Sequence, residues 1–507
     1  MKQHERCLLR REEEKFSLRL GAARSGSPPS SRGPVLGASS IQVEMSRRVR
    51  AIPCGGIGAV HLLAQKVGLV EALDTRLHIL KRRRPYSESD HILNIAYNFL
   101  CGGSVLDDIE VRRNDPVFLD ALGATMIPDP TTAADFCRRF HADQLQRFMD
   151  IVNNVRASVW KKQPSAFFKQ AARIDADSSI VETKAECKQG MNIAYNGAWG
   201  YQALIISLAN TGEPLFIINR SGNRPSAEGS PEYFDRAITL CREAGFQDIL
   251  LRGDTAFSLT KNFDRWDNDS VRFVFGYGAS KTMVEHADAI GDDEFQLLVR
   301  KAENEFSKRA KQPRIKEQII REREFNNIRL EREDIAEFEY QPGNTDRPYR
   351  FIVLAKTITE EKGQRTLGYK NRYFFYVTND RKLSAEEVIR EANGRCNQEN
   401  LISQLKNGPR ALHAPLHTLD SNWAYMLIAS LAWSLKAWFA LLTPISPRWR
   451  KKHEADRERV QRMDFRSFVQ HLIMIPAQIL FTGRRLVYRI LAWRPDLPIL
   501  FRLLDGL

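Results

Sequence analysis

Apolar residues recur along the chain with two different spacings, and the change between them marks its main structural division. Between about residues 57 and 160 they recur every three or four positions, as at Leu63, Val67 and Val70, which predicts helices. From about residue 170 the spacing becomes typical of strands, and after about residue 380 it is helical again. The pattern therefore predicts a sheet-containing centre between two helical regions.

The central region predicts a mixed α/β sheet. Short runs rich in β-branched and aromatic residues are separated by turns and by one helix. The expected strands contain RIDAD (173–177), YQALIISLAN (201–210), PLFIINR (214–220), DILLRGD (248–254), VRFVFGYG (271–278), YRFIVLAKT (349–357) and NRYFFYVTND (371–380). Strands joined by tight turns, followed by a helix and a further strand, favour a single mixed sheet.

Capping residues predict where several helices begin and end. The segment from Ser87 to Asp90 resembles a capping box before an apolar run. Thr131 or Thr132 is the expected N-cap of a short helix in the first helical region. Ser230 is the expected N-cap of the helix in the central region, and Gly245 is its expected C-cap.

The charge balance points to a polyanionic partner. Lys and Arg number 76 against 62 Asp and Glu, a formal net charge of +14 at pH 7. Composition leaves DNA, RNA, an acidic membrane surface and an acidic protein open as partners. It excludes a fully disordered chain, a collagen-like repeat and a small disulfide scaffold. Between residues 444 and 494, 12 basic and 4 acidic residues give a net charge of +8, over half of the total excess.

Cysteine usage and the longest apolar run both bear on the cellular setting. The seven cysteines are an odd number without CxxC spacing, so neither a disulfide framework nor structural zinc is expected, and a reducing cytosol fits. The apolar run from about Ala424 to Leu442 contains Lys436 and two serines. A charge in its interior favours a buried core helix over a membrane span.

Four acidic residues occupy positions where sheets and helices place functional groups. Asp175 and Asp177 are two residues apart on one expected strand, so their side chains lie on the same face. Asp254 ends another strand, and sites in α/β sheets gather at the carboxyl ends of strands. Glu399 lies on a helix that Ser384 is expected to cap and that runs on to about residue 406. Position alone is weak support, because an aspartate at a strand end more often caps a turn or a helix.

The short sequence words around these acids are more specific. In chain order they are RIDADSS, GYQALIISLANTGEPL, NRSGN, LLRGDTAF and a helix pattern in which three and then six residues separate Arg395, Glu399 and Lys406. This set resembles DDE-type insertion-sequence transposases, specifically the bacterial insertion-sequence thirteen-eighty group of the insertion-sequence-4-like clan. The resemblance covers about residues 46–495. Ala392 stands where the clan's helix pattern has Tyr, and RGDTAF has Thr where the family word has Ser.

The resemblance implies a ribonuclease H-like α/β core with a β-rich insertion, preceded and followed by helical regions. In that fold the first acid lies on the first strand, the second just after the fourth strand and the third on a later helix. The pattern of residues indicates the same order independently. The implied catalytic and metal-binding residues are Asp177, Asp254 and Glu399, and Asp175 remains the alternative for the first position.

The resemblance also implies a cofactor and contacts with DNA. Carboxylate oxygens suit Mg²⁺ or Mn²⁺, and two such ions, about 3.5–4 Å apart, assist phosphodiester displacement. Arg395 and Lys406 would hold DNA phosphates near the ions, or would merely solvate a helix face. Arg252 would contact DNA or pair with Asp254.

Two aromatic residues and two histidines remain as weaker candidates. Trp199 and Trp266 could stack on a displaced base, although packing in the core is favoured for both. His413 and His417 are four residues apart but lack a neighbouring acidic word. They are therefore expected at the surface or in packing contacts, and not as zinc ligands.

Pattern, charge and resemblance together divide the chain into six expected regions. Residues 1–45, rich in Ser, Gly and Pro towards their end, form a disordered arm or an upstream extension. The other regions are a helical DNA-binding region (46–168), the first part of the core (169–280), a β-rich charged insertion with a return to the core (281–380), core helices that carry the third acid (381–443), and a basic helical C-terminal region (444–507). Within the insertion, residues 300–340 are expected to have a solvated surface.

The predicted function is that of a DNA transposase acting in the bacterial cytoplasm. It would cleave at the terminal inverted repeats of its own element and join the ends to target DNA, with double-stranded DNA as its partner. Paired ends favour a homodimer, and no membrane is involved. The alternatives are a catalytically inactive, domesticated DNA-binding protein and a ribonuclease H-like nuclease acting on RNA or branched DNA.

Overall fold

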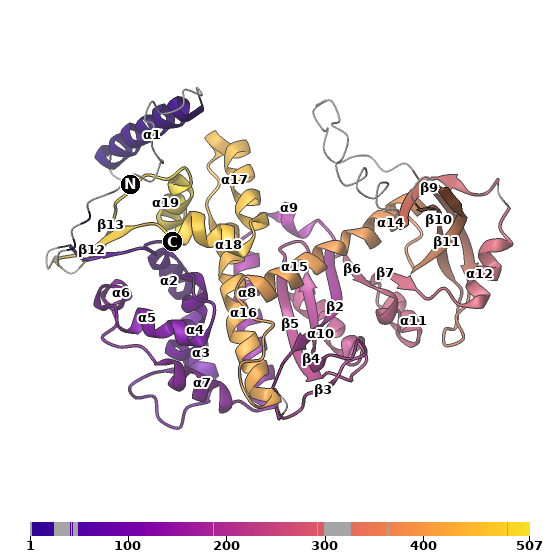
Figure 1. Ribbon diagram of the computed structural model, residues 1–507, viewed down its shortest axis with the longest axis horizontal. Helices are drawn as coiled ribbons and strands as arrows, with labels where there is room; N and C mark the ends of the chain where they lie inside the picture. The colour runs from indigo at the N-terminus through magenta and orange to yellow at the C-terminus, as the bar shows by residue number, and fades with distance from the viewer. Residues whose placement is uncertain are drawn as a thin grey trace.

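The computed structural model describes residues 3–24, 41, 43, 49–185, 187–291, 293–298, 326–362, 365–483 and 485–507. Within these residues the molecule is elongated and has three parts along its longest axis (Figure 1). A helical part contains both ends of the chain, a sheet occupies the centre, and long strands with α12 (Lys281–Asp288) lie at the other end.

The first helical part confirms the helices that the three- to four-residue spacing of apolar positions predicts. Its helices are α2 (Ile57–Lys66), α3 (Leu69–Arg76), α4 (Glu88–Leu100), α5 (Ile109–Arg113), α6 (Pro116–Ala121), α7 (Pro130–Arg138), α8 (Ala142–Lys161) and α9 (Ser165–Phe168). The expected capping box is present, and the Ser87 N–H donates to Asp90 at 2.8 Å. The expectation for α7 is wrong, because Asp129 is the N-cap and its carboxylate accepts the Thr132 N–H at 2.8 Å.

The N-terminal region differs from the expectation of a disordered arm. Gln3–Arg24 forms the helix α1. The Phe16 ring of this helix packs against the Trp493 ring with a centroid distance of 4.9 Å. The Ser, Gly and Pro residues on which that expectation rested lie almost wholly after α1, outside the described residues.

Five strands form the core of the central sheet, in the order β5–β4–β2–β6–β7. They are β2 (Ala172–Glu182), β4 (Trp199–Leu208), β5 (Glu213–Ser221), β6 (Ile249–Gly253) and β7 (Arg272–Tyr277), which confirms the strands predicted there. β4 runs antiparallel to β2 and to β5, whereas β6 runs parallel to β2 and β7 parallel to β6. The short β3 (Asn192–Ile193) pairs with β4.

The helix α10 (Ser230–Ala244) connects β5 to β6 and packs against β2 and β4. Its N-cap is Gly229, with φ 77°, and not the expected Ser230. Glycine adopts this left-handed conformation at little cost, so the helix can begin directly after the turn. Gly245 is the C-cap, as predicted.

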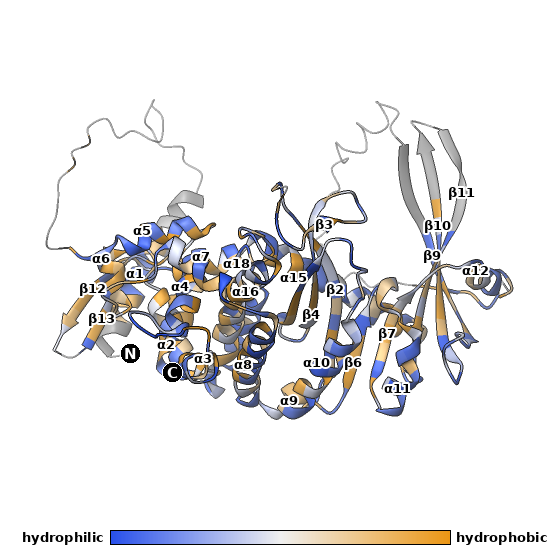
Figure 2. Ribbon diagram, turned by 90° about the horizontal axis from the view of Figure 1, so that it is seen from below, coloured by the Kyte–Doolittle hydropathy of each residue, from blue (hydrophilic) through white to orange (hydrophobic). Residues whose placement is uncertain are grey.

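Three long strands extend the sheet beyond β7. β11 (Arg365–Thr378) pairs with β7, and β10 (Tyr349–Lys362), β9 (Asn326–Tyr340) and β8 (Gln296–Leu297) follow in antiparallel order. Figure 2 shows β9, β10 and β11 side by side, at the opposite end of the molecule from β12 and β13. Residues 326–340, part of the stretch expected to have a solvated surface, form β9, and that expectation is wrong for 333–336, which are buried, while 300–325 lie outside the described residues.

Residues 385–507 are only partly helical, contrary to the expectation for residues 444–507. Its helices are α14 (Ala385–Gly394), α15 (Cys396–Asn407), α16 (Leu419–Leu442), α17 (Arg450–Arg462), α18 (Phe465–Phe468) and α19 (Leu497–Gly506). Between α18 and α19, β12 (Ala477–Thr482) and β13 (Arg485–Ile490) form a hairpin that joins β1 (Ala51–Ile52) in a three-stranded sheet. The alternating pattern of this segment is that of a sheet with one buried face.

The apolar run forms α16, which passes between the central sheet and the first helical part and contacts β5, α4 and α8. By length and composition it is the one helix among the described residues that could cross a membrane, but 94% of its most apolar window is buried inside the protein. The ammonium of Lys436 donates to the Gln461 carbonyl at 2.8 Å and lies over the Trp433 ring. The expected buried core helix is therefore present.

A buried ion pair joins the helical part to the sheet. Arg156 of α8 and Glu213 of β5 are 2% and 0% exposed, and Nε donates to Oε1 at 2.9 Å. The indole N–H groups of Trp160 and Trp438 donate to the same carboxylate at 2.9 and 2.8 Å. Arg156 also donates to Ser434 of α16 at 3.1 Å. The hydrogen bonds of this ion pair thus hold α8, β5 and α16 together.

Glu213→Gln should lower the free energy of unfolding by about 3 kcal/mol or more, because it leaves the Arg156 charge buried without its counter-ion. Urea unfolding followed by circular dichroism measures the change. The matched control is Glu228→Gln, which breaks an exposed pair with Arg224 and should cost less than about 1 kcal/mol. Equal losses in the two variants would contradict the role given to the buried pair.

Candidate active site

Asp177 lies in the middle of β2, opposite Ile205 of β4. Its side chain is 16% exposed. The Ser178 N–H donates to Oδ1 at 2.7 Å, and Nη1 of Arg395 lies 3.4 Å from Oδ2. The carboxylate therefore keeps an opening to solvent while two donors fix its orientation.

Asp254 directly follows β6 and accepts the Ala256 N–H at 2.8 Å, so it also caps the short turn after the strand. β2 and β6 are parallel, and Asp175 is in register with Arg252. Asp177 and Asp254 each lie two residues beyond that pair, which places them side by side across strands about 4.8 Å apart. The parallel register brings the first two predicted acids together.

Glu399 lies on the first turn of α15, and its side chain is 62% exposed. Its Oε1 lies 3.6 Å from Nη2 of Arg395, so this arginine stands between the first and the third predicted acids. The neighbouring Gln398 is 1% exposed and holds the helix on the sheet. It donates to the Ile205 carbonyl at 3.2 Å and accepts from the Ser207 hydroxyl.

The electrostatic environment of Asp177 includes the charges of Asp254 and Glu399. Burial raises the pKa of Asp177 to about 6, and the negative charges of Asp254 and Glu399 act in the same direction. The Ser178 N–H and the Arg395 guanidinium oppose this rise in the pKa. A carboxyl group with a raised pKa beside two other acids is typical of a functional site.

The donor set of this site fits a divalent metal ion. Carboxylate oxygens are the ligands that Mg²⁺ and Mn²⁺ prefer, and a cation would offset the charges of Asp254 and Glu399, which add to the effect of burial on the pKa of Asp177. Within the part of the chain that the structure describes, no three His, Cys, Asp or Glu side chains converge closely enough to coordinate one ion. The exposed Glu399 is the carboxylate with most freedom to complete such a set.

Asp175 is on the same strand face but has a different role. It is 1% exposed and forms a two-bonded ion pair with Arg252, Nε to Oδ1 at 2.7 Å and Nη2 to Oδ2 at 2.9 Å. The pair neutralises Asp175 in the interior, so its oxygens are committed. Geometry thus favours Asp177 over Asp175 as the first acid.

Arg252 pairs with Asp175, and not with Asp254 as one expectation held. It is 3% exposed, and Nη1 also donates to the carboxylate and to the carbonyl oxygen of Glu391, each at 3.1 Å. A guanidinium bound on all sides in this way has no exposed N–H for a DNA phosphate in this conformation. The expected DNA contact of Arg252 therefore finds no support in its surroundings.

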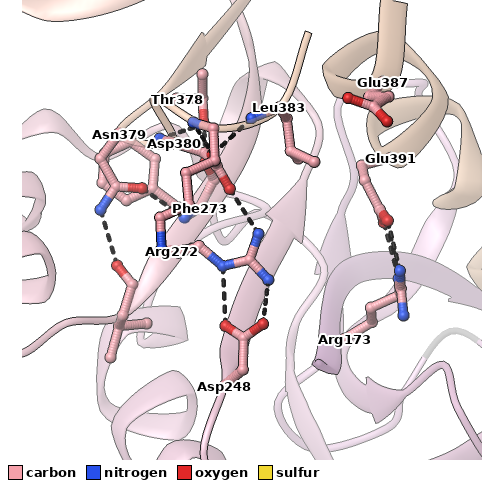
Figure 3. Close-up of polar contacts among 12 residues, drawn as sticks. Arg173, Asp248, Arg272, Phe273, Thr378, Asn379, Asp380, Leu383, Glu387 and Glu391 are labelled. Carbon is pink, nitrogen blue, oxygen red and sulfur yellow. Dashed lines mark hydrogen bonds and ion pairs between the residues drawn. The ribbon is translucent and has the colours of Figure 1, made fainter. Parts of the chain in front are cut away.

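Glu391 and its partners hold α14 against the sheet. Arg173 of β2 donates to this carboxylate through Nε at 2.8 Å and Nη2 at 2.5 Å, and the two side chains face each other in Figure 3. Nearby, Arg272 lies between Asp248 and Asp380, and Asp380 accepts the N–H groups at the start of the turn into α14 (Figure 3).

Sequence reasoning missed these supporting residues, although a signal was present. Arg173 lies two residues before Asp175 on the same strand face, and Glu391 lies one helical turn before Arg395. The expectation of one continuous helix from Ser384 is also wrong, since α14 and α15 meet at Arg395. The capping box of Ser384 and Glu387 is present at the predicted position.

The weaker candidates lie in different environments. Trp266 is 1% exposed and packs among Phe234, Phe273 and Phe275, as favoured. Trp199 is 51% exposed at the start of β4, so the expectation of core packing is wrong for it. The remaining candidates occupy the segment after Glu399: Lys406 lies two turns further along α15 and is half-buried, His413 contacts the Lys406 carbonyl at 3.0 Å, and His417 is exposed.

Comparison with known proteins identifies the family to which the chain belongs. The family model of the transposase DDE domain, group 1, matches residues 44–507, so the chain belongs to this family. Among solved structures it is similar to a chain of a piggyBac transposase synaptic complex with hairpin DNA, at 10% identity and a TM-score of 0.37. That match covers 84% of this chain and 83% of the other. A comparison with curated proteins finds no match.

Asp177→Asn should stabilise the protein at high pH. The folded-state pKa of Asp177 lies above its ordinary value of 3.8, so folding favours the protonated carboxyl, and wild-type stability falls as the pH rises through about 6. The variant should exceed the wild type by up to about 3 kcal/mol at about pH 8 and match it at about pH 4. Urea unfolding at both pH values measures the difference. A difference independent of pH would contradict the raised pKa.

Gly394→Ala tests the contact between α14 and Arg252. A Cβ added at this position would lie 2.6 Å from Nη1 of Arg252, which four hydrogen bonds hold in place. Helix propensity alone predicts a gain of about 1 kcal/mol, but we expect a loss of about 1–3 kcal/mol. Thermal unfolding measures it, with Ala392→Gly, on the same helix, as the control for propensity. A stabilised Gly394→Ala variant would show that the contact is loose.

Proposed function

We propose that this protein is a DNA transposase that cleaves at the terminal inverted repeats of its own insertion sequence and joins the ends to target DNA. The observation that carries the proposal is the position of Asp177 on β2 beside Asp254 after the parallel strand β6, with Arg395 between Asp177 and Glu399, in a chain that belongs to the transposase DDE family. The sequence words around these acids support placement in the insertion-sequence thirteen-eighty group.

The topology supports a ribonuclease H-like core. The strand order β5–β4–β2–β6–β7, with the first three strands antiparallel and the last two parallel to β2, has the first acid on the first long strand. The second acid follows the fourth strand, and the third lies on a helix after the inserted β9–β11 segment. This is the arrangement that the resemblance implies for the three carboxylates.

Asp177, Asp254 and Glu399 would hold Mg²⁺ or Mn²⁺, two ions for each site. Such ions activate the attacking oxygen and stabilise the leaving oxygen of a phosphodiester. Asp177, half enclosed by the sheet, would fix the position of the metal site, and Glu399 would turn from Arg395 to complete it. Arg395, released from the carboxylates, would then be available to a DNA phosphate close to the scissile bond.

The partner would be double-stranded DNA, first at the ends of the element and then at the target. The net charge of +14 supports binding to a polyanion, and Lys406 extends the basic surface along α15 from the acids. Because two ends must be processed together, we propose that a homodimer forms on the paired ends. The reaction would take place in the bacterial cytoplasm.

Asp254→Ala should lower Mg²⁺-dependent nicking of end DNA by at least about 100-fold and leave binding to that DNA intact. Glu399→Gln should have the same effect, because the amide keeps the size of the side chain but loses the charge. Nicking on a denaturing gel and a mobility-shift assay on the same duplex separate the two activities. The matched control is Asp269→Ala, which removes an aspartate that is 59% exposed and pairs with Arg242 away from the site.

The same assays distinguish the alternatives. A wild-type chain that binds end DNA but nicks no substrate with Mg²⁺ or Mn²⁺ is an inactive DNA-binding protein. A chain that cleaves RNA–DNA hybrids or branched DNA in preference to end DNA is a ribonuclease H-like nuclease and not a transposase. Nicking that persists at the wild-type rate in Asp254→Ala would overturn the assignment of the second acid.

A further inference from the structure

The hairpin β12–β13 has one face that packs on the helical part and one that faces solvent. Tyr488 points inward, where its ring lies against Gly58 and its hydroxyl donates to the Ala121 carbonyl. The cross-strand pairs that alternate with it point outward, and we call them the outer ribbon face. Its members are Gln478, Leu480, Thr482, Arg485, Val487 and Arg489.

The outer ribbon face carries positive charge in a segment without acidic residues. Residues 465–495 contain five arginines and no Asp or Glu. Arg485 and Arg489 are both exposed and lie four residues apart on β13, which puts them on the same face about 13 Å from each other. The face therefore attracts an anion whose charges are spread along a line.

The side chains on this face include those that read base edges. Nη1 of Arg489 donates to the Gln478 amide oxygen at 3.3 Å, so a guanidinium and an amide lie together across the ribbon. Arginine pairs with the edge of guanine and glutamine with that of adenine. Val487, 37% exposed between the two arginines, offers an apolar surface of the kind that contacts the thymine methyl group.

The dimensions of the ribbon fit duplex DNA. A two-stranded β-ribbon is narrow enough to enter the major groove, and a six-residue strand, at about 3.3 Å per residue, spans about six base pairs. Among the described residues β13 pairs with β12 alone, so its outer edge is open. A second copy paired on that edge would bring like charges at Arg485 and Arg489 together, which disfavours self-association.

We propose that the outer ribbon face binds duplex DNA in the major groove, with Gln478 and Arg489 contacting base edges and Arg485 contacting phosphate. The inference rests on the proposed transposase function, since it assigns part of the recognition of the element's ends. It places this recognition on a sheet built from both ends of the chain, and not on the helices of residues 46–168 alone.

The test uses the full-length chain and a duplex that the wild type selects from a randomised pool, together with a scrambled duplex of the same length. Arg489→Ala should lower affinity for the selected duplex about 10-fold or more and affect the scrambled duplex much less. Gln478→Ala, which removes no charge, should also reduce the preference for the selected duplex. Arg489→Lys should keep binding to the scrambled duplex but lose discrimination, because lysine lacks the two-pronged geometry.

Arg485→Ala should lower the affinity for both duplexes equally. The number of ions released on binding, measured from the salt dependence of the affinity, should fall by about one, as expected for a phosphate contact. The matched control is Arg242→Ala, which removes one exposed arginine from α10 and should leave discrimination unchanged. Thermal unfolding verifies that each variant is folded. We expect all of them to fold, because the replaced side chains lie on the protein surface.

Wild-type affinity and discrimination in both Arg489→Ala and Gln478→Ala would overturn the proposal. A change in sedimentation behaviour with unchanged DNA binding would also overturn it, because the face would then be a contact between copies. Either result leaves the proposed function standing if Asp254→Ala still abolishes nicking. Loss of that dependence on Asp254 would instead remove the proposed function itself.

Discussion

The buried ion pair between Arg252 and Asp175 fixes the frame in which the three carboxylates of the site lie. An unpaired charge in the interior costs several kcal/mol, about 3–5 when one partner of such a pair is lost, so the two side chains must stay together. Their pairing sets β2 and β6 in one register. Arg252 then binds the end of α14 through Glu391, which places the start of α15.

Asp177 and Asp254 therefore lie on and directly after β2 and β6, the two strands that the Arg252 guanidinium joins, and Glu399 lies on α15, the helix that follows the α14 held by the same guanidinium. The same arrangement separates two kinds of acid on β2. Asp175 is buried and paired with Arg252, whereas Asp177, two residues further, keeps an opening to solvent. Two aspartates that look equivalent in the sequence differ because only one of them lies level with an arginine on the next strand.

The sequence was sufficient to predict the strands of the core and the order of the acids, because alternating apolar residues report directly on burial. It could not predict the partner of Arg252, since Asp175 and Asp254 are both close to it and only the register of β2 and β6 decides between them. The hairpin β12–β13 was expected to be helical for a similar reason. Its partner β1 lies more than 400 residues earlier in the sequence, and a local sequence pattern cannot predict pairing between strands so far apart.

The three-stranded sheet of β1, β12 and β13 also has a consequence for the order of events during synthesis. β1 is translated long before β12, its hydrogen-bonding partner, because most of the described chain lies between them. At about 5–20 residues per second, the first helices wait tens of seconds for the strands that complete their packing. A nascent chain that stops before residue 477 lacks this pairing, so the packing of the first helical part is completed only after β12 and β13 are made.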